Sequence, residues 1–266
     1  MQDGFFIFVD SFLMEYTLKK KLGQHFLKDE RIIQKIIDSL TESKSDARCL
    51  LEIGPGGGAL TRHLIQIPGI QFKAVEIDHE KVEFLHKKFP SHKEAFIESD
   101  FLQMENPFEE SFRIIGNFPY NISTQILFKI LEWKNAVPEI MGMFQKEVAQ
   151  RIAALPGNKT YGIISVLIQA FYDVEYLFDI PPESFTPPPK VMSGMIRLKV
   201  RNEIPLMKSE AYFFRLVKLA FNQRRKMLRN AVKSLFSEIV LSDDLFSRRA
   251  ETLSVNEFAQ LTFKMH

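Results

Sequence analysis

Short apolar runs and segments of helical periodicity alternate through the first part of the chain, and this alternation restricts the possible folds more than any other feature. The apolar runs, which we expect to be strands, cover residues 48–53, 72–77, 96–98, 113–115 and 141–144. Segments with apolar residues at helical spacing lie at residues 59–67, 80–89, 123–133 and 147–155. Strands that alternate with helices form a parallel sheet covered on both faces. The sequence therefore predicts an α/β fold.

The pattern changes towards the C-terminus. Residues 174–180 and 192–200 are extended runs joined by a proline-rich loop, and the second alternates apolar with basic residues. This is typical of an antiparallel hairpin at the edge of a sheet. After Pro205 only helical periodicity remains, so we place a domain boundary near residues 201–207. We expect an N-terminal extension, a sheet-containing domain and an all-helical domain, at residues 1–13, 14–202 and 203–266.

Composition and cysteine content exclude several classes of protein. Of the 266 residues, 45% are hydrophobic and 26% are charged, the balance of a globular protein rather than of a disordered chain or a disulfide scaffold. The one cysteine, Cys49, has no partner within the chain and lies in an apolar run, so we expect a reducing, cytoplasmic setting. The six histidines show no metal-ligand spacing, and no apolar stretch is long enough to span a membrane. We expect no metal, no membrane insertion and a monomer.

Basic residues are concentrated in one segment near the C-terminus. Residues 208–234 hold eight lysines and arginines but one acidic residue, Glu210, so they carry a net charge of +7, whereas the whole chain carries +2. The rest of the chain is therefore mildly acidic. This asymmetry fits either a binding surface for a polyanion or a solvated helix face.

A glycine-rich segment follows the first predicted strand and precedes a predicted helix. It covers residues 51–59, in which Gly54, Gly56 and Ala59 fit the spacing of nucleotide-binding loops. Without side chains, the backbone can turn sharply and approach a ligand closely. Glycines at a strand-to-helix junction also form simple turns, so the loop alone leaves both interpretations open.

Acidic residues stand at the ends of the next two predicted strands. Glu76 closes the second strand, 22 residues after Gly54, where a carboxylate can accept the protons of ribose hydroxyls, and Asp100 follows the third strand. Because parallel strands end at one edge of a sheet, these groups and the glycine loop predict a nucleoside cofactor lying across that edge. Either acid alone would be an ordinary loop carboxylate. At this point the pattern allows NAD or S-adenosylmethionine.

The residues Asn117, Phe118, Pro119 and Tyr120 close the fourth predicted strand at the same edge. The exocyclic amine of adenine is a poor nucleophile, because its lone pair is delocalised into the ring. Two acceptors aimed at its hydrogens would localise that lone pair: the Asn117 side-chain carbonyl and the Phe118 backbone carbonyl, near which Pro119 offers no competing N–H. The Tyr120 ring offers a surface for the base. Outside this context the same residues form an ordinary turn.

With these motifs the chain resembles a known family, the S-adenosylmethionine-dependent ribosomal RNA adenine N6,N6-dimethyltransferases of the KsgA type. The resemblance runs from about Leu18 to the C-terminus. It rests on five motifs in the family's order, at residues 21–27, 51–58, 117–120, 185–191 and 221–226. The resemblance implies a class I, Rossmann-like methyltransferase sheet with a small all-helical C-terminal domain, and S-adenosylmethionine as the cofactor.

The resemblance also implies the residues of the site. The cofactor would contact eight of them: Gln24, His25, Leu27, Gly54, Gly56, Glu76, Asp100 and Asn117. The catalytic group would comprise Asn117, Phe118, Pro119, Tyr120 and Phe185. In that group, the Tyr120 and Phe185 rings would stack around an adenine taken out of its helix or loop. His25 departs from the pattern, because many members carry Asn there.

The basic segment would then contact RNA phosphates through Arg224, Arg225, Lys226 and Arg229. The resemblance implies dimethylation of two adjacent adenosines near the 3′ end of small-subunit ribosomal RNA, linked to maturation of that subunit. A large-subunit RNA dimethyltransferase would carry a similar site, but the run at residues 222–226 argues against it. An assembly factor whose methylation is secondary also fits these motifs, and a nicotinamide dehydrogenase fits them less well.

Overall fold

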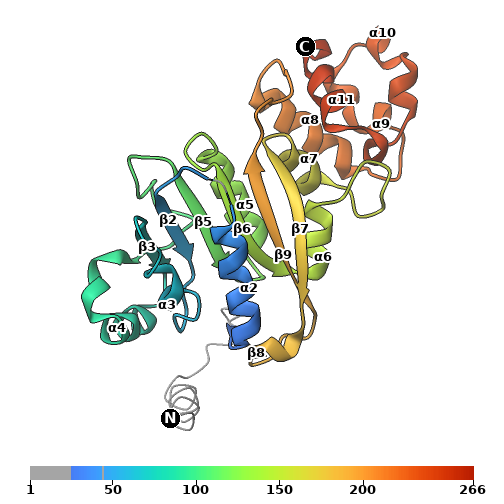
Figure 1. Ribbon diagram of the computed structural model, residues 1–266. Helices are drawn as coiled ribbons and strands as arrows, with labels where there is room; N and C mark the ends of the chain where they lie inside the picture. The colour runs from blue at the N-terminus through green and yellow to red at the C-terminus, as the bar shows by residue number, and fades with distance from the viewer. Residues whose placement is uncertain (1–24, 44) are drawn as a thin grey trace.

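A seven-stranded sheet forms the centre of the computed structural model, which describes residues 25–43 and 45–266 (Figure 1). Its strands are β2 (Cys49–Ile53), β3 (Gln71–Glu76), β4 (Phe96–Glu98), β5 (Phe112–Asn117), β6 (Glu139–Gln145), β7 (Tyr172–Ile180) and β9 (Ser193–Val200). Their order across the sheet is β4-β3-β2-β5-β6-β9-β7. Strands β2 to β6 are parallel, as predicted, so all five end at one edge, which we call the carboxyl edge. The predicted extension at residues 1–13 and the predicted cofactor residue Gln24 lie outside the described residues.

Helices cover both faces of the sheet, because successive strand residues point to opposite faces. They are α2 (Glu30–Thr41), α3 (Thr61–Leu64), α4 (His79–Lys88), α5 (Ser123–Glu132), α6 (Lys146–Ile152) and α7 (Ile163–Gln169). Leu51 and Ile114 pack in a buried cluster with side chains of α5, α6 and α7. Leu50 and Ile115 pack in a second cluster, on the opposite face, with side chains of α2 and α3. The predicted covering of both faces is confirmed.

The helix predicted over residues 59–67 is much shorter in the structure. Helix α3 covers Thr61–Leu64, and turns follow it. Pro68 explains the early end, because a residue that precedes proline avoids the helical region of backbone space. On the other side, Gly58 has a φ of 76°, which keeps the chain out of a right-handed helix just before α3.

The predicted antiparallel hairpin is confirmed, but its second strand lies inside the sheet. Strand β9 inserts between β6 and β7 and is antiparallel to both, so β7 forms the edge. Ile196 is buried on the α5–α7 face and Met195 on the α2 face. The basic Arg197 of this inner strand is accommodated because its Nε lies 3.3 Å from the Glu139 carboxylate.

A second, two-stranded sheet joins segments far apart in the sequence. Strand β1 (Phe26–Leu27) pairs antiparallel with β8 (Phe185–Thr186), which follows the 3-10 helix η3 (Pro182–Ser184). The Lys28 backbone N–H extends this pairing by donating to the Ser184 carbonyl at 2.9 Å. The pairing brings the residues around β1 to the carboxyl edge, where His25 bonds the end of β5.

Helices and turns alone follow Pro205 in the described chain, as predicted. They are α8 (Glu210–Asn222), α9 (Leu228–Val232), α10 (Glu238–Leu241) and α11 (Val255–Leu261), with short 3-10 helices η4 (Lys233–Leu235), η5 (Asp244–Ser247), η6 (Ala250–Thr252) and η7 (Thr262–Lys264); η2 (Pro90–Ala95) lies earlier in the chain. Figure 1 shows the C-terminal helices at the end of the molecule opposite β8. Phe213 and Leu216 belong to the same buried cluster as α5–α7. Because one cluster spans both regions, the boundary near residues 201–207 stays a prediction.

Candidate active site

The glycine loop after β2 turns sharply beside open space. Gly54, Gly56 and Gly58 have φ angles of 68°, 54° and 76°, which other residues rarely adopt. A Cβ atom built on Gly54 would meet no other atom within 4 Å. The Gly54 N–H donates to the Val75 carbonyl of β3 at 2.9 Å, which fixes the start of the loop. At Gly54 the loop therefore presents open backbone at the carboxyl edge.

Glu76, at the end of β3, lies directly beside this loop. One carboxylate oxygen, Oε2, accepts a hydrogen bond from the Gly56 N–H at 3.3 Å and lies 3.5 Å from Lys81 Nζ. The other oxygen accepts bonds from the N–H groups of Ile77 and Asp78 at 3.1 and 3.2 Å. These donors hold a nearly buried carboxylate in a fixed orientation at the predicted cofactor edge.

Asp100 follows the adjacent strand β4 and is half-buried. Its Oδ1 accepts a hydrogen bond from the Leu102 N–H at 2.9 Å, which forms a local turn. No described residue bonds the other carboxylate oxygen. The loop, Glu76 and Asp100 thus stand at the ends of three neighbouring strands, as predicted.

A third acid, Glu52, is buried one residue before the end of β2. It is 2% exposed, and its carboxyl group accepts a hydrogen bond from Thr61 Oγ1 at 2.6 Å. Burial raises the pKa of Glu52 to about 8, and the charge of the nearby Glu76 acts in the same direction. The carboxyl edge therefore keeps a largely protonated acid close to the Glu76 carboxylate.

Asn117, at the end of β5, has a fixed amide orientation. Its Nδ2 donates a hydrogen bond to the His25 backbone carbonyl at 2.8 Å. A carbonyl can only accept, so the NH₂ side of the amide must face His25, and Oδ1 must face the other way. The half-buried amide consequently keeps its acceptor oxygen available at the carboxyl edge.

The ring of Phe118 anchors the turn that follows. It is completely buried and meets the Phe144 ring edge-on, with ring centroids 5.2 Å apart. A Cβ on Gly116 or Gly142 would approach this ring to 2.7 or 2.6 Å, so both glycines make room for it. No described residue donates to the Phe118 carbonyl, which remains able to accept a hydrogen bond.

Tyr120 is held in place by two contacts. Its hydroxyl shares a hydrogen bond with Ser193 Oγ of β9. Its ring lies beside the His25 ring at a centroid distance of 5.6 Å and an angle of 31°. The His25 Nδ1 in turn lies 2.8 Å from the Pro187 carbonyl. His25 thus joins three of the sequence motifs.

The glycine loop and the turn at residues 117–120 belong to one site. Their strands β2 and β5 are hydrogen-bonded neighbours. The consecutive residues His25 and Phe26 touch both, because His25 bonds Asn117 and the Phe26 ring would lie 3.1 Å from a Cβ on Gly56. Cofactor and substrate groups predicted for the two turns therefore meet at one edge.

Comparisons with known proteins agree with this geometry. The family model for ribosomal RNA adenine dimethylase matches residues 15–261. The chain is 54% identical to the ribosomal RNA small subunit methyltransferase A of Cytophaga hutchinsonii over 247 residues, which are 92% of this chain and 95% of the relative. The chain belongs to the ribosomal RNA adenine dimethylase family. It is an S-adenosylmethionine-dependent enzyme that methylates adenine in ribosomal RNA.

Solved structures show the same fold. A dimethyladenosine transferase from Plasmodium falciparum superposes with a TM-score of 0.74 and 25% identity, over 89% of this chain and 96% of the other. The 23S rRNA methyltransferase ErmE superposes with a TM-score of 0.67 and 25% identity, over 88% and 99%. The predicted class I, Rossmann-like sheet of this dimethylase is therefore confirmed, as are the cofactor and the enzyme class.

Two predicted site residues of the dimethylase have buried side chains. Phe185 has no exposed surface and packs in the α2 cluster, so its ring has no free face on which a base could stack. The predicted stacking of Phe185 on adenine is wrong for this conformation. Leu27, the partner of Phe185 in the β1–β8 ladder, is 5% exposed and packs in the same cluster. Its contact with the cofactor stays a prediction.

The predicted RNA contacts of the dimethylase fall into two groups. Arg225 and Lys226 are exposed, as expected. Arg224 is instead paired within the protein surface, with its Nε 2.6 Å from the Glu251 carboxylate, and Arg229 Nε donates to the Phe246 carbonyl at 3.5 Å. The sequence pattern could not separate these groups, because the partners of the paired arginines lie in other segments.

Four contacts at the site were not predicted from the sequence. Lys81 lies beside Glu76, Ser193 bonds Tyr120, Phe26 covers Gly56, and Thr61 bonds Glu52. Lys81 and Thr61 could have been found from the sequence, because each lies in the first helical turns after a strand that carries a predicted site residue. Phe26 lies in the motif at residues 21–27, but its place over Gly56 was not predicted, and Ser193 carried no signal, because strand pairing over long distances brings both residues in.

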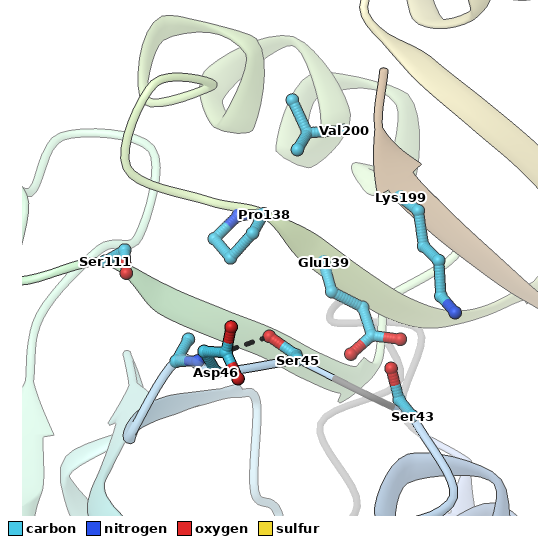
Figure 2. A pocket seen from close by; sticks show the side chains of 9 residues that line it. Ser43, Ser45, Asp46, Ser111, Pro138, Glu139, Lys199 and Val200 are labelled. Atoms are coloured by element: carbon cyan, nitrogen blue, oxygen red, sulfur yellow. Dashed lines mark hydrogen bonds between the residues drawn. The ribbon is translucent and has the colours of Figure 1, made fainter. Parts of the chain in front are cut away.

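A cavity lies at the opposite edge of the sheet (Figure 2). It measures about 320 Å³ and is lined by residues at the start of β6 and the end of β9, among them Glu139 and Lys199. It therefore does not belong to the site of the dimethylase. Within residues 25–43 and 45–266, no three His, Cys, Asp or Glu side chains gather as metal ligands. Over the same residues, every helix is too short or too polar for a bilayer crossing.

Proposed function

We propose that this enzyme dimethylates the N6 amines of two adjacent adenosines near the 3′ end of small-subunit ribosomal RNA, and that Asn117 is its main catalytic residue. The 54% identity to a small subunit methyltransferase supports the substrate. The Asn117 amide, oriented by the His25 carbonyl, is the observation that carries the mechanism.

The amide and the Phe118 carbonyl act on the target amine. Asn117 Oδ1 and the Phe118 carbonyl each accept one hydrogen bond from the amine, which draws the nitrogen towards a tetrahedral geometry and localises its lone pair. Pro119 supplies no N–H that would compete for these carbonyls. The Tyr120 ring, held by Ser193 and His25, provides a flat surface for the base. Catalysis then consists largely of positioning.

The residues at the ends of β2, β3 and β4 fit the cofactor. The open backbone at Gly54 leaves room for a ligand, and the Glu76 carboxylate lies where ribose hydroxyls can donate to it. Asp100 has a free carboxylate oxygen for a further polar group, and His25 closes the site next to Asn117. When bound, S-adenosylmethionine supplies the methyl group from its sulfonium.

The remaining parts of the proposal concern the partner and the setting. The enzyme acts as a monomer in the cytoplasm, on RNA within the small ribosomal subunit or its precursor. The exposed Arg225 and Lys226 contact RNA phosphates. The methyl transfers contribute to maturation of the subunit.

The test is a methylation assay on under-methylated small ribosomal subunits with labelled S-adenosylmethionine, followed by mass spectrometry of the RNA. We expect label on two neighbouring adenosines near the 3′ end, each carrying two methyl groups. Label confined to large-subunit RNA, or absent from adenine N6, would overturn the proposal.

A further inference from the structure

The loop between α6 and α7 is fixed to the C-terminal helices by two hydrogen bonds, and an ion pair within the C-terminal region supports one of them. The Gly157 N–H donates to the Glu251 backbone carbonyl at 2.7 Å. Arg224, in the turn after α8, donates through Nε to the Glu251 carboxylate at 2.6 Å and through Nη2 to the Lys159 carbonyl. We call residues 155–161 and 223–227 together the junction. One guanidinium group thus holds both sides of the junction.

Burial around the junction makes this arrangement rigid. The Tyr161 ring at the end of the loop is completely buried and meets the Phe221 ring of α8 at a centroid distance of 6.2 Å. The Arg224 side chain is 38% exposed and its partner Glu251 is 22% exposed, so the ion pair is partly shielded from water. The loop and the turn after α8 therefore keep a constant spacing.

Three other cations of the junction do not take part in this pair. Lys159, Arg225 and Lys226 are exposed, and no carboxylate among the described residues pairs with them. Arg224 contributes no net charge, because Glu251 neutralises it. The junction thus presents three unneutralised positive charges, one from the sheet region and two from the helical region.

We propose that Lys159, Arg225 and Lys226 form one composite surface for RNA phosphates, and that Arg224 is a positioning residue that sets their spacing. The inference deepens the proposed function, on which it rests. A polyanionic strand is the partner that such a surface fits, because it places several phosphates within reach of unpaired cations. Lys159 is the additional contact, because it lies outside the basic segment at residues 208–234.

The position of the junction indicates what the surface does. Figure 1 shows the C-terminal helices and β8 at opposite ends of the molecule, so the junction lies far from the carboxyl edge. Phosphates bound there belong to a different part of the RNA from the reacting adenosine. The composite surface therefore raises the affinity for RNA and leaves the methyl-transfer step unchanged.

The first experiment measures binding of under-methylated small ribosomal subunits as a function of salt, with Lys159→Ala and the matched control Lys93→Ala. Lys93 is an exposed lysine of η2, outside the junction. Loss of one phosphate contact should lower the slope of log affinity against log salt by about 0.7 to 0.9 for Lys159→Ala. It should also raise KM severalfold at unchanged kcat, whereas Lys93→Ala should match the wild type. An unchanged slope for Lys159→Ala would overturn the composite surface.

The second experiment separates the two roles of Arg224. Arg224→Lys keeps the charge but cannot hold the Glu251 carboxylate and the Lys159 carbonyl together in the same geometry. A positioning role predicts weaker RNA binding for Arg224→Lys and Arg224→Ala alike, at an unchanged salt slope. Glu251→Ala, which frees Arg224, should also weaken binding. Tighter binding by Glu251→Ala, or full binding by Arg224→Lys, would show that Arg224 is a phosphate ligand.

Methylation of small subunits by the wild-type enzyme distinguishes failure of this inference from failure of the proposed function. If the wild type methylates small subunits but the junction variants bind normally, the further inference alone is wrong. If the wild type methylates no small-subunit adenosine, the proposed function is wrong. Thermal unfolding of each variant establishes that it is folded at the assay temperature.

Discussion

The two edges of the sheet both bury charged residues, but the balance of acidic and basic groups differs between them. At the edge where β6 begins, Glu139 is 2% exposed and faces Arg197 Nε at 3.3 Å and Arg113 Nη1 at 3.9 Å. The same two arginines donate to the carbonyls of Ser39 and Leu40 at the end of α2. Each of these three charged groups lies within ion-pair distance of an opposite charge, and the cations lie at the end of a helix that favours them.

At the carboxyl edge the buried acids outnumber the buried bases. Glu52, Glu76 and Asp78 are all buried there, with one buried cation, Lys81. The glycine loop beside them is open at Gly54. The comparison shows that one edge uses buried charge to stabilise the fold, whereas the other retains an excess of negative charge next to the site.

The largest expected effect concerns the stability cost of Glu52. Its pKa is raised from 4.5 to about 8 in the folded protein, so the folded state holds the proton more tightly than the unfolded state. The contribution of Glu52 to stability should be fully present below pH 4.5 and be lost as the pH rises from there through 8, by up to about 5 kcal/mol. Urea unfolding between pH 5 and 9 measures this. Glu52→Gln, which cannot titrate, should lose less stability over that range, and equal losses would contradict the expectation.

Glu139→Ala tests the other edge. Removing this carboxylate leaves two buried arginines without it and should lower the free energy of unfolding by about 3–5 kcal/mol. Glu175→Ala is the matched control, because Glu175 pairs with the same Arg197 but is 60% exposed. The control should change stability by about 1 kcal/mol or less. Methyl transfer by folded Glu139→Ala should be normal. A loss of kcat would contradict the assignment of a purely structural role to this edge.

Asn117→Ala should slow methyl transfer by about 10²- to 10³-fold, the usual effect of removing one preorganised polar group from a transition state. Steady-state kcat at saturating cofactor measures it. Asn121→Ala, an exposed asparagine just after the same turn, is the control and should behave as the wild type. Full activity of Asn117→Ala would remove its catalytic role.

Glu76→Ala should weaken S-adenosylmethionine binding by about 1.5–3 kcal/mol, roughly ten- to hundredfold, because hydrogen bonds to a charged acceptor are lost. Calorimetry gives the dissociation constant directly. Glu98→Ala is the control, since Glu98 ends the neighbouring strand β4 but is exposed and faces His79. Equal affinities for both variants would show that the carboxyl edge does not hold the ribose through Glu76.

The parts of the site that could be predicted are those set by neighbours in the sequence. Gly54, Glu76, Asp100 and Asn117 each follow or end an apolar run, and parallel strands necessarily end together. Their meeting at one edge therefore follows from the common direction of the parallel strands. Alternating apolar residues likewise indicated which side chains would be buried.

Phe185 and Arg224 show where such prediction fails. An aromatic residue before three prolines has the same sequence signal whether its ring faces a ligand or the core. An arginine in a basic run has the same signal whether it meets RNA or Glu251. Burial and ion pairing depend on residues of distant segments, so neither outcome is encoded near the residue itself.

The sequence by itself determined the order of strands and helices, the parallel sheet, the helical C-terminal region and the residues that gather at the carboxyl edge, because these depend on local periodicity and on strand direction. The tertiary structure decided the insertion of β9 inside the sheet, the orientation of the Asn117 amide by the His25 carbonyl, and the pairing of Arg224 with Glu251. Each of these depends on a contact between segments far apart in the chain. Only the folded backbone places such partners within hydrogen-bonding distance.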